Sequence, residues 1–73
     1  MQRYAIGIDI GGTRTKVGLA DINEGRVLYL IVSPTERFDP DLFISSLYSQ
    51  YCSLLEKTGI SAEMIAGLGI GAP

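Results

Sequence analysis

The stretch that decides the fold is Tyr4-Ala-Ile-Gly-Ile-Asp-Ile-Gly-Gly-Thr-Arg-Thr-Lys-Val17, in which two glycines join an apolar segment to a hydroxyl-rich one. Residues 4–10 form a short apolar run, and residues 13–21 alternate between apolar and polar side chains, so both segments are predicted β-strands. We expect Gly11 and Gly12 to supply the positive φ angles of a tight two-residue hairpin. The sequence therefore predicts an antiparallel hairpin over residues 4–21.

The same hairpin has the composition of a phosphate-binding turn. Gly11 and Gly12 leave the backbone N–H groups bare, and successive bare amides form a concavity that attracts anions. Thr13 adds a hydroxyl donor, and Arg14 adds positive charge. Asp9 precedes the turn, where one carboxylate can hold a hydrated Mg²⁺ against phosphate oxygens. These residues predict a site for a phosphate group with its magnesium ion.

A purely structural explanation of these residues is also available. Gly-Gly hairpins are common, and an aspartate at the end of a strand is often a turn residue. However, an acid near the end of an otherwise apolar strand is costly to bury unless it is paired or bound to a metal, so Asp9 favours the phosphate interpretation. Lys16 is more simply explained as a solvent-facing lysine on an edge strand.

The rest of the chain alternates turns with regular elements. Asn23-Glu24-Gly25 predicts a second hairpin turn, and the apolar strand that follows over residues 26–33 is expected to be covered on both faces in the complete protein. Asp39 and Pro40 have the properties of a helix N-cap and first helical residue, so a helix is predicted over residues 40–57 that ends at Gly59. A short helical turn over 61–64 and a glycine-rich parallel strand over 65–71 complete the pattern.

Composition excludes several classes of function. The 73 residues carry a net charge of −2 without a basic stripe, which argues against a nucleic-acid surface. No apolar run approaches the ~20 residues of a membrane helix, and no secretory leader is present, so a cytoplasmic protein is expected. The single cysteine, Cys52, excludes an internal disulfide and is expected to have an inert packing role.

Ile8-Asp9-Ile10-Gly11-Gly12-Thr13 resembles the first phosphate motif of the superfamily that contains sugar kinases, actin and chaperone ATPases. Together with Leu19-Ala20-Asp21 and the closing run Gly67–Pro73, it looks like the ROK family of repressors, open reading frames and sugar kinases. This resemblance spans essentially the whole chain. It implies that residues 1–73 are the N-terminal part of the first domain of a two-domain protein.

The ROK resemblance implies an α/β, ribonuclease-H-like fold. Three antiparallel strands, a crossover helix and a parallel fourth strand are expected in the order 3-2-1-4, with the helix on one face. The implied activity is that of a glucokinase-like enzyme that transfers phosphate from ATP to a hexose or an N-acetylated hexosamine. We expect the parent to be a homo-oligomer, and the isolated segment to be inactive.

The same resemblance assigns the site residues. Asp9, Gly11, Gly12, Thr13 and Arg14 are implied to bind the ATP phosphates, with Asp9 holding Mg²⁺ through water. At Arg14, where ROK proteins usually carry lysine or asparagine, a phosphate contact and a solvated strand-edge charge remain alternatives. The resemblance places the catalytic base, the adenosine pocket, the sugar contacts and a structural zinc motif beyond residue 73, so no catalytic residue is assigned in this segment.

Two other functions remain open. One is the sugar-sensing domain of a ROK transcriptional repressor, although only three residues precede Tyr4, which leaves no space for a DNA-binding domain after Met1. The other is an activator-type ATPase like those of acyl-CoA dehydratases, which Thr13-x-Thr15-Lys16 suggests. Gly12 and the closing Gly-Ala-Pro favour the kinase. The pattern Gly67-x-Gly69-x-x-Ala72 formally matches a dinucleotide fingerprint, but its glycines lie inside a predicted strand.

Overall fold

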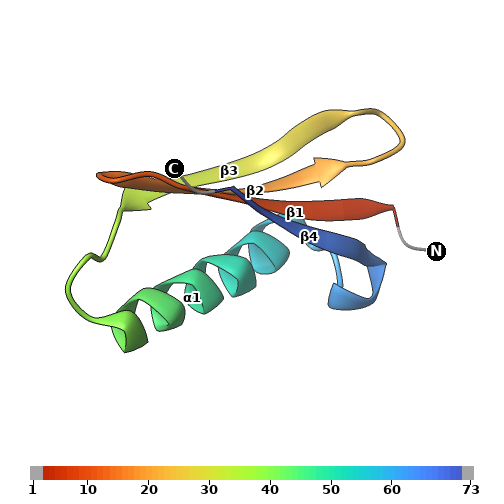
Figure 1. Ribbon diagram of the computed structural model, residues 1–73. Helices are drawn as coiled ribbons and strands as arrows, with labels where there is room; N and C mark the ends of the chain where they lie inside the picture. The colour runs from red at the N-terminus through yellow and green to blue at the C-terminus, as the bar shows by residue number, and fades with distance from the viewer. Residues whose placement is uncertain (1–2, 72–73) are drawn as a thin grey trace.

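The computed structural model describes residues 3–71 and shows an α/β arrangement in which one helix packs against a four-stranded mixed sheet (Figure 1). The sheet order is β3-β2-β1-β4, with β1, β2 and β3 antiparallel and β4 parallel to β1, which confirms the predicted order. The elements are β1 (Tyr4–Ile10), β2 (Arg14–Asp21), β3 (Arg26–Pro34), α1 (Pro40–Thr58), the short 3₁₀ helix η1 (Ala62–Met64) and β4 (Ile65–Gly71).

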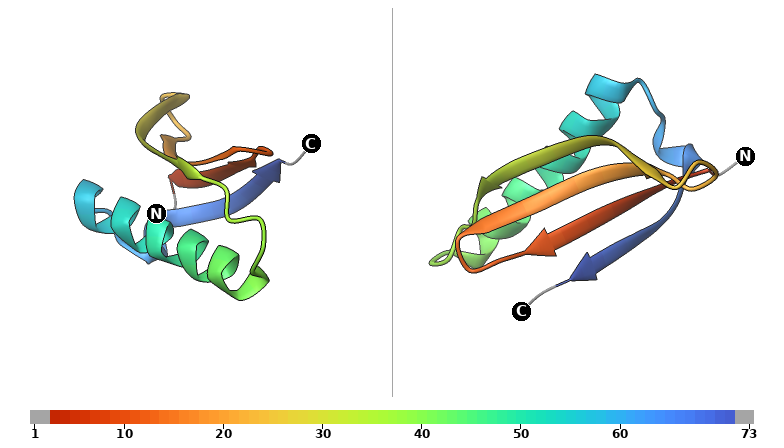
Figure 2. Two further views of the ribbon diagram at one scale, coloured as in Figure 1. Left: turned by 90° about the vertical axis from the view of Figure 1, so that its left-hand side faces the viewer. Right: turned by 90° about the horizontal axis from the view of Figure 1, so that it is seen from above.

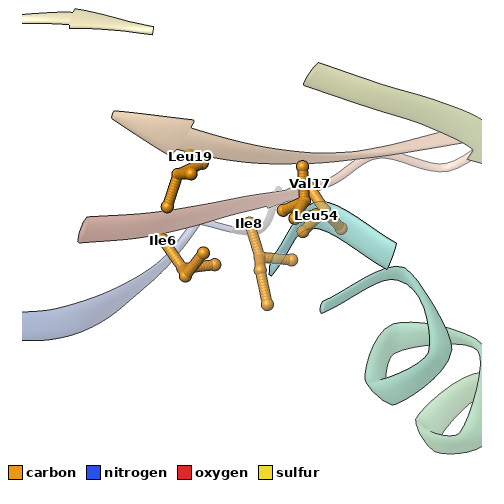
Figure 3. Packing of buried hydrophobic residues seen from close by; sticks show 5 residues of the cluster. All are labelled: Ile6, Ile8, Val17, Leu19 and Leu54. Carbon is orange, nitrogen blue, oxygen red and sulfur yellow. The ribbon is translucent and has the colours of Figure 1, made fainter. Parts of the chain in front are cut away.

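The core lies between the sheet and α1. Alternation along β1 and β2 directs every second side chain toward the helix, and the register pairs Ile6 with Leu19 and Ile8 with Val17. These four side chains and Leu54 of α1 form the buried cluster (Figure 3). The first hairpin is therefore the main component of the core.

Helix α1 begins and ends where the sequence predicts. The Asp39 carboxylate accepts hydrogen bonds from the N–H groups of Asp41 and Leu42, and Pro40 is the first helical residue. Gly59 adopts the left-handed conformation with φ 73°, and its N–H donates to the carbonyl of Leu55. Both ends are thus defined by local chemistry, whereas the contact with the sheet is made by the buried Leu54 and the partly buried Leu47 and Tyr51.

The β2–β3 turn also follows its prediction, because Gly25 has φ 66° and its N–H donates to the Asp21 carbonyl at 2.8 Å. Strand β3 lies at the edge of the sheet, and Val27, Leu30 and Val32 on it are exposed in this chain, so its cover in a complete protein stays a prediction. One expectation about the strands is wrong. Lys16 does not lie on an edge strand, because β2 is flanked by β1 and β3.

Helix α1 covers one face of the sheet and leaves the other open (Figure 2). The strand register places Gly7 and Gly69 side by side on the open face, while Leu68 and Ile70 share the helix-side face with Ile6 and Ile8. The glycine alternation of β4 therefore separates a small-residue face from an aliphatic face. Among the described residues, no helix is long and apolar enough to cross a membrane. Ala72 and Pro73 of the closing run lie outside the described residues.

Candidate functional site

The β1–β2 hairpin closes through a backbone contact at Gly11. The Gly11 N–H donates to the carbonyl of Arg14 at 2.9 Å, and a Cβ added at Gly11 would lie 2.8 Å from that same oxygen. Positive φ angles occur at Gly25 and Gly59 but not at Gly11 or Gly12, so the expected positive-φ hairpin is wrong. Glycine is needed at position 11 because two backbone segments approach closely, not because of its φ angle.

The tip of the hairpin presents two free amides. Within the described part of the chain, the N–H groups of Gly12 and Thr13 donate no hydrogen bond, whereas the Gly11 N–H is used by Arg14. A Cβ built at Gly12 would meet nothing within 4 Å, and Thr13 is exposed. Two adjacent unpaired amides beside open space form the kind of concavity that binds an anion. Gly12 and Thr13 thus fit the predicted donor role, and the Gly11 amide does not.

Thr35, which the sequence analysis did not single out, connects this hairpin to the segment between β3 and α1. Its N–H donates to the Thr13 carbonyl at 2.9 Å, and its hydroxyl donates to the Gly11 carbonyl at 2.9 Å. The Thr35 hydroxyl also lies 2.8 Å from that of Thr15, a side chain that is only 2% exposed. The sequence gives little indication of this network, because Thr35 stands 24 residues from Gly11.

Asp9 lies on the open face of the sheet. Its position alternates with the buried Ile8, and its Cα partners are Lys16 on β2 and Gly71 on β4. The Asp9 Oδ1 atom is 4.0 Å from where a Cβ at Gly71 would stand, so glycine there keeps the space beside the carboxylate open. Asp9 and Lys16 are both exposed and form no ion pair with each other. The carboxylate is accessible to a cation.

Arg14 is the first residue of β2, opposite Pro34 of β3. It is exposed and takes part in neither of the ion pairs found among the described residues, Arg3–Asp21 and Arg26–Glu24. Because β2 lies inside the sheet, the strand-edge alternative for Arg14 does not describe its position. Its charge lies next to the hairpin tip.

A cleft of about 600 Å³ separates the hairpin tip from the start of α1. One wall is formed by Gly11, Gly12 and Thr13, and the other includes Glu36 and Asp39. Glu36 accepts hydrogen bonds from the N–H groups of Phe38 and Asp39, so carboxylates already occupy the amides at this end of the helix. An anion in the cleft is therefore favoured at the hairpin side and opposed at the helix side.

The described residues contain no cluster of three or more His, Cys, Asp or Glu side chains that could hold a metal by themselves. Asp9 is a single carboxylate, which suits Mg²⁺ only when phosphate oxygens and water complete its shell. Cys52 is exposed on α1, so the expected packing role is not seen among the described residues.

Comparison with known proteins shows a similarity of fold and no match of sequence. No family model and no curated protein matches the sequence. The chain is similar to the solved structure of a "Reductive activator for corrinoid,iron-sulfur protein", with a TM-score of 0.82, 18% sequence identity and 97% of this chain covered. The chain spans 15% of the length of that protein.

This finding corrects the ROK-family assignment, because the similar structure is a reductive activator and not a sugar kinase or a ROK repressor. The glucokinase-like activity and the role in carbohydrate metabolism are wrong for the same reason. The physical cause of the error lies in the residues used. Gly11-Gly12-Thr13 specifies a tight turn, and the glycines over residues 67–71 give β4 a small-residue face on the open side of the sheet. Neither segment specifies the second substrate.

Proposed function

We propose that this chain is the phosphate-binding part of an ATP-binding domain of the activator type, with a ribonuclease-H-like fold that residues 1–73 begin. The hairpin tip is the part that contacts the phosphates. Gly12 and Thr13 contribute N–H donors, Thr13 adds its hydroxyl, and Arg14 contributes positive charge. The observation that carries this proposal is the pair of unpaired amides at Gly12 and Thr13.

Magnesium is the second element of the proposal. Asp9 would hold the ion through its waters, since Mg²⁺ keeps several waters and takes few protein carboxylates when phosphate oxygens are present. The exposed carboxylate supports this role, as does the glycine at position 71, where a Cβ would contact the Asp9 Oδ1 atom. When bound, the ion would neutralise charge on the phosphates. The protein's own contribution is to keep Asp9 at the end of β1, beside the carboxyl end of the parallel strand β4.

Two observations favour an activator-type protein over other phosphate binders. The fold is similar to that of a reductive activator over 97% of this chain. Thr13-x-Thr15-Lys16 resembles the phosphate motif of the activator-type ATPases. We further propose that ATP turnover, and any action on a redox partner, belong to a longer protein in which this segment supplies the phosphate side of the cleft.

A pair of glycine variants tests the phosphate role. Gly12→Ala adds a methyl group that meets nothing in the protein and requires no unusual φ angle, so the fold is retained. The methyl group would stand where a phosphate must approach the amides. We expect a loss of about tenfold in affinity for Mg·ATP, as for one charge-assisted hydrogen bond. Isothermal titration calorimetry of the 73-residue chain measures it.

Gly7→Ala is the matched control, because a Cβ at Gly7 also meets nothing within 4 Å and lies in the middle of β1. It should bind Mg·ATP as the unaltered chain does. Equal affinities for the Gly12 variant, the Gly7 variant and the unaltered chain would contradict the proposal, as would a complete lack of binding by the unaltered chain.

A further inference from the structure

We propose that Thr35 is a positioning residue that aims the free amide of Gly12 at the phosphate, an inference that rests on the proposed phosphate-binding role of the hairpin. Thr35 lies just beyond the end of β3 and forms three hydrogen bonds with the hairpin, through its N–H and its hydroxyl. It belongs to the segment that links β3 to α1, so it ties the tip to a different part of the fold.

The direction of each hydrogen bond follows from the proton count. A threonine hydroxyl has one proton, and that of Thr35 is donated to the Gly11 carbonyl. The contact of 2.8 Å between the two hydroxyls must then be donated by Thr15. The result is a chain in which Thr15 donates to Thr35 and Thr35 donates to Gly11. Such chains strengthen each member bond in a buried setting, and Thr15 is only 2% exposed.

The geometry of the peptide group links this chain to the ligand. The bond between Gly11 and Gly12 is trans, since no cis peptide is present in the described residues. In a planar trans peptide the C=O and the following N–H point in opposite directions. Fixing the Gly11 carbonyl toward Thr35 therefore directs the Gly12 N–H away from Thr35. The Thr35 N–H restrains the other side of the tip by binding the Thr13 carbonyl.

The hydrogen bonds of Thr35 restrain a hairpin tip that has little other restraint on the orientation of Gly12. Among the described residues other than its chain neighbours, nothing lies within 4 Å of the Gly12 Cβ position, so packing does not limit the orientation of Gly12. Glycine also loses more conformational freedom on ordering than other residues. If the tip were unrestrained, its loss of conformational entropy on binding would reduce the affinity for phosphate. With Thr35 in place, the tip is already ordered in the folded protein, so phosphate binding does not carry this entropic cost.

Four variants of the 73-residue chain test the inference with Mg·ATP as the probe. Thr35→Val keeps the shape and the backbone N–H but removes the hydroxyl, and should weaken affinity by about fivefold, as for one neutral hydrogen bond. Thr35→Ser restores the hydroxyl and should restore affinity. Thr58→Val is the control, because the Thr58 hydroxyl also donates to a backbone carbonyl, that of Leu54 at 2.7 Å, at the far end of α1.

The fourth variant addresses stability. Thr35→Val alone leaves the buried Thr15 hydroxyl without its acceptor and can lower the melting temperature. The double variant Thr15→Val/Thr35→Val removes both partners, which is nearly neutral for folding, and should still lose affinity. A second readout needs no ligand: the ¹⁵N and ¹H shifts of the Gly12 amide should change in both valine variants and stay in place in Thr35→Ser and Thr58→Val.

The outcomes separate this inference from the proposed function. If the unaltered chain binds Mg·ATP and the double valine variant binds it with equal affinity, the role of Thr35 is wrong and the phosphate site stands. The same conclusion follows if the ¹⁵N and ¹H shifts of the Gly12 amide do not change in the valine variants. A lack of binding by the unaltered chain would overturn the proposed function, and this inference with it.

Discussion

The two glycines at the hairpin tip differ in what an added methyl group would meet. At Gly11 it would stand 2.8 Å from the Arg14 carbonyl, which is backbone and cannot move aside without opening the hairpin. Gly11→Ala should therefore cost about 1–3 kcal/mol, as overpacking does. For a chain of this size that lowers the melting temperature by ~4–8 °C per kcal/mol. Thermal unfolding followed by circular dichroism measures the shift.

Gly12→Ala serves as the comparison, because its Cβ meets open space and its melting temperature should stay within ~2 °C of the unaltered chain. Equal melting temperatures for both alanine variants would show that the close approach at Gly11 is absent in solution.

The last residue of β2, Asp21, is the acid whose titration is expected to affect folding. The Asp21 carboxylate accepts from the Glu24 N–H at 3.0 Å and from the Arg3 guanidinium at 3.0 Å. These donors, the Glu24 amide foremost, hold the pKa of Asp21 below its ordinary value despite the opposing effect of desolvation. The lowered pKa means that Asp21 stabilises the fold fully above pH ~5 and loses this contribution as the pH falls through and below the ordinary value of about 3.9.

Asp21→Asn tests this dependence. The variant should be less stable than the unaltered chain at pH 7, and the difference should shrink as the pH is lowered toward 2. Urea unfolding at a series of pH values provides the measurement. A difference that stayed constant between pH 7 and pH 2 would exclude Asp21 as the source of acid sensitivity.

Among the elements, α1 contacts the sheet through one fully buried side chain, with Leu47 and Tyr51 partly buried against the same core. Leu54 is its one buried side chain among the described residues and is 0% exposed, whereas Ile44 on the same helix is 62% exposed. Leu54→Ala should cost about 2–5 kcal/mol, because it leaves a cavity in the core. Ile44→Ala should stay within ~0.5 kcal/mol, as for a surface substitution.

Urea unfolding of both variants, followed by far-ultraviolet circular dichroism, makes this comparison. If Ile44→Ala proved as destabilising as Leu54→Ala, the helix would sit on the sheet in a different rotation from the one described.

The elements themselves could be predicted because their causes are local. Asp39, Pro40 and Gly59 define α1 within a few residues of its ends, and the alternation over residues 4–21 defines the hairpin. The hydrogen bonds of Thr35 could not be predicted, because they depend on tertiary packing. Thr35 stands 20 positions from Thr15 and 24 positions from Gly11 in the sequence. The reason why position 11 requires glycine was also not predicted. The sequence of a turn does not show whether glycine is needed for a positive φ angle or for a close backbone contact.

The proximity of the candidate site residues also follows from the local hairpin sequence, whereas their binding of phosphate stays a prediction. Asp9, Gly12, Thr13 and Arg14 lie around the hairpin tip or beside it, but Gly11 has its amide occupied by Arg14. The side of the sheet on which Asp9 lies follows from strand alternation with Ile8. These residues do not specify a family, because a turn of this composition carries no information about which molecule would donate or receive a phosphate group.

At the scale of the whole molecule, the chain presents one covered and one open face of its sheet (Figure 1). The open face carries Asp9 and Lys16 near the hairpin tip, and the exposed apolar side chains of Val27 and Leu30 farther along the sheet. An exposed apolar patch beside charged groups is typical of a surface that meets other protein or a ligand. The open face is therefore the side of this sheet on which further protein or a ligand can be accommodated.

The most direct test of the phosphate site is a titration of the ¹⁵N-labelled 73-residue chain with Mg·ATP, followed by two-dimensional ¹H–¹⁵N correlation spectra. The account predicts saturable shifts that are largest at the amides of Gly12 and Thr13, and a smaller response at Asp9 that disappears when Mg²⁺ is removed with a chelator. Unmoved Gly12 and Thr13 amides at saturating Mg·ATP, or shifts centred on Asp41 and Leu42 at the start of α1, would contradict it.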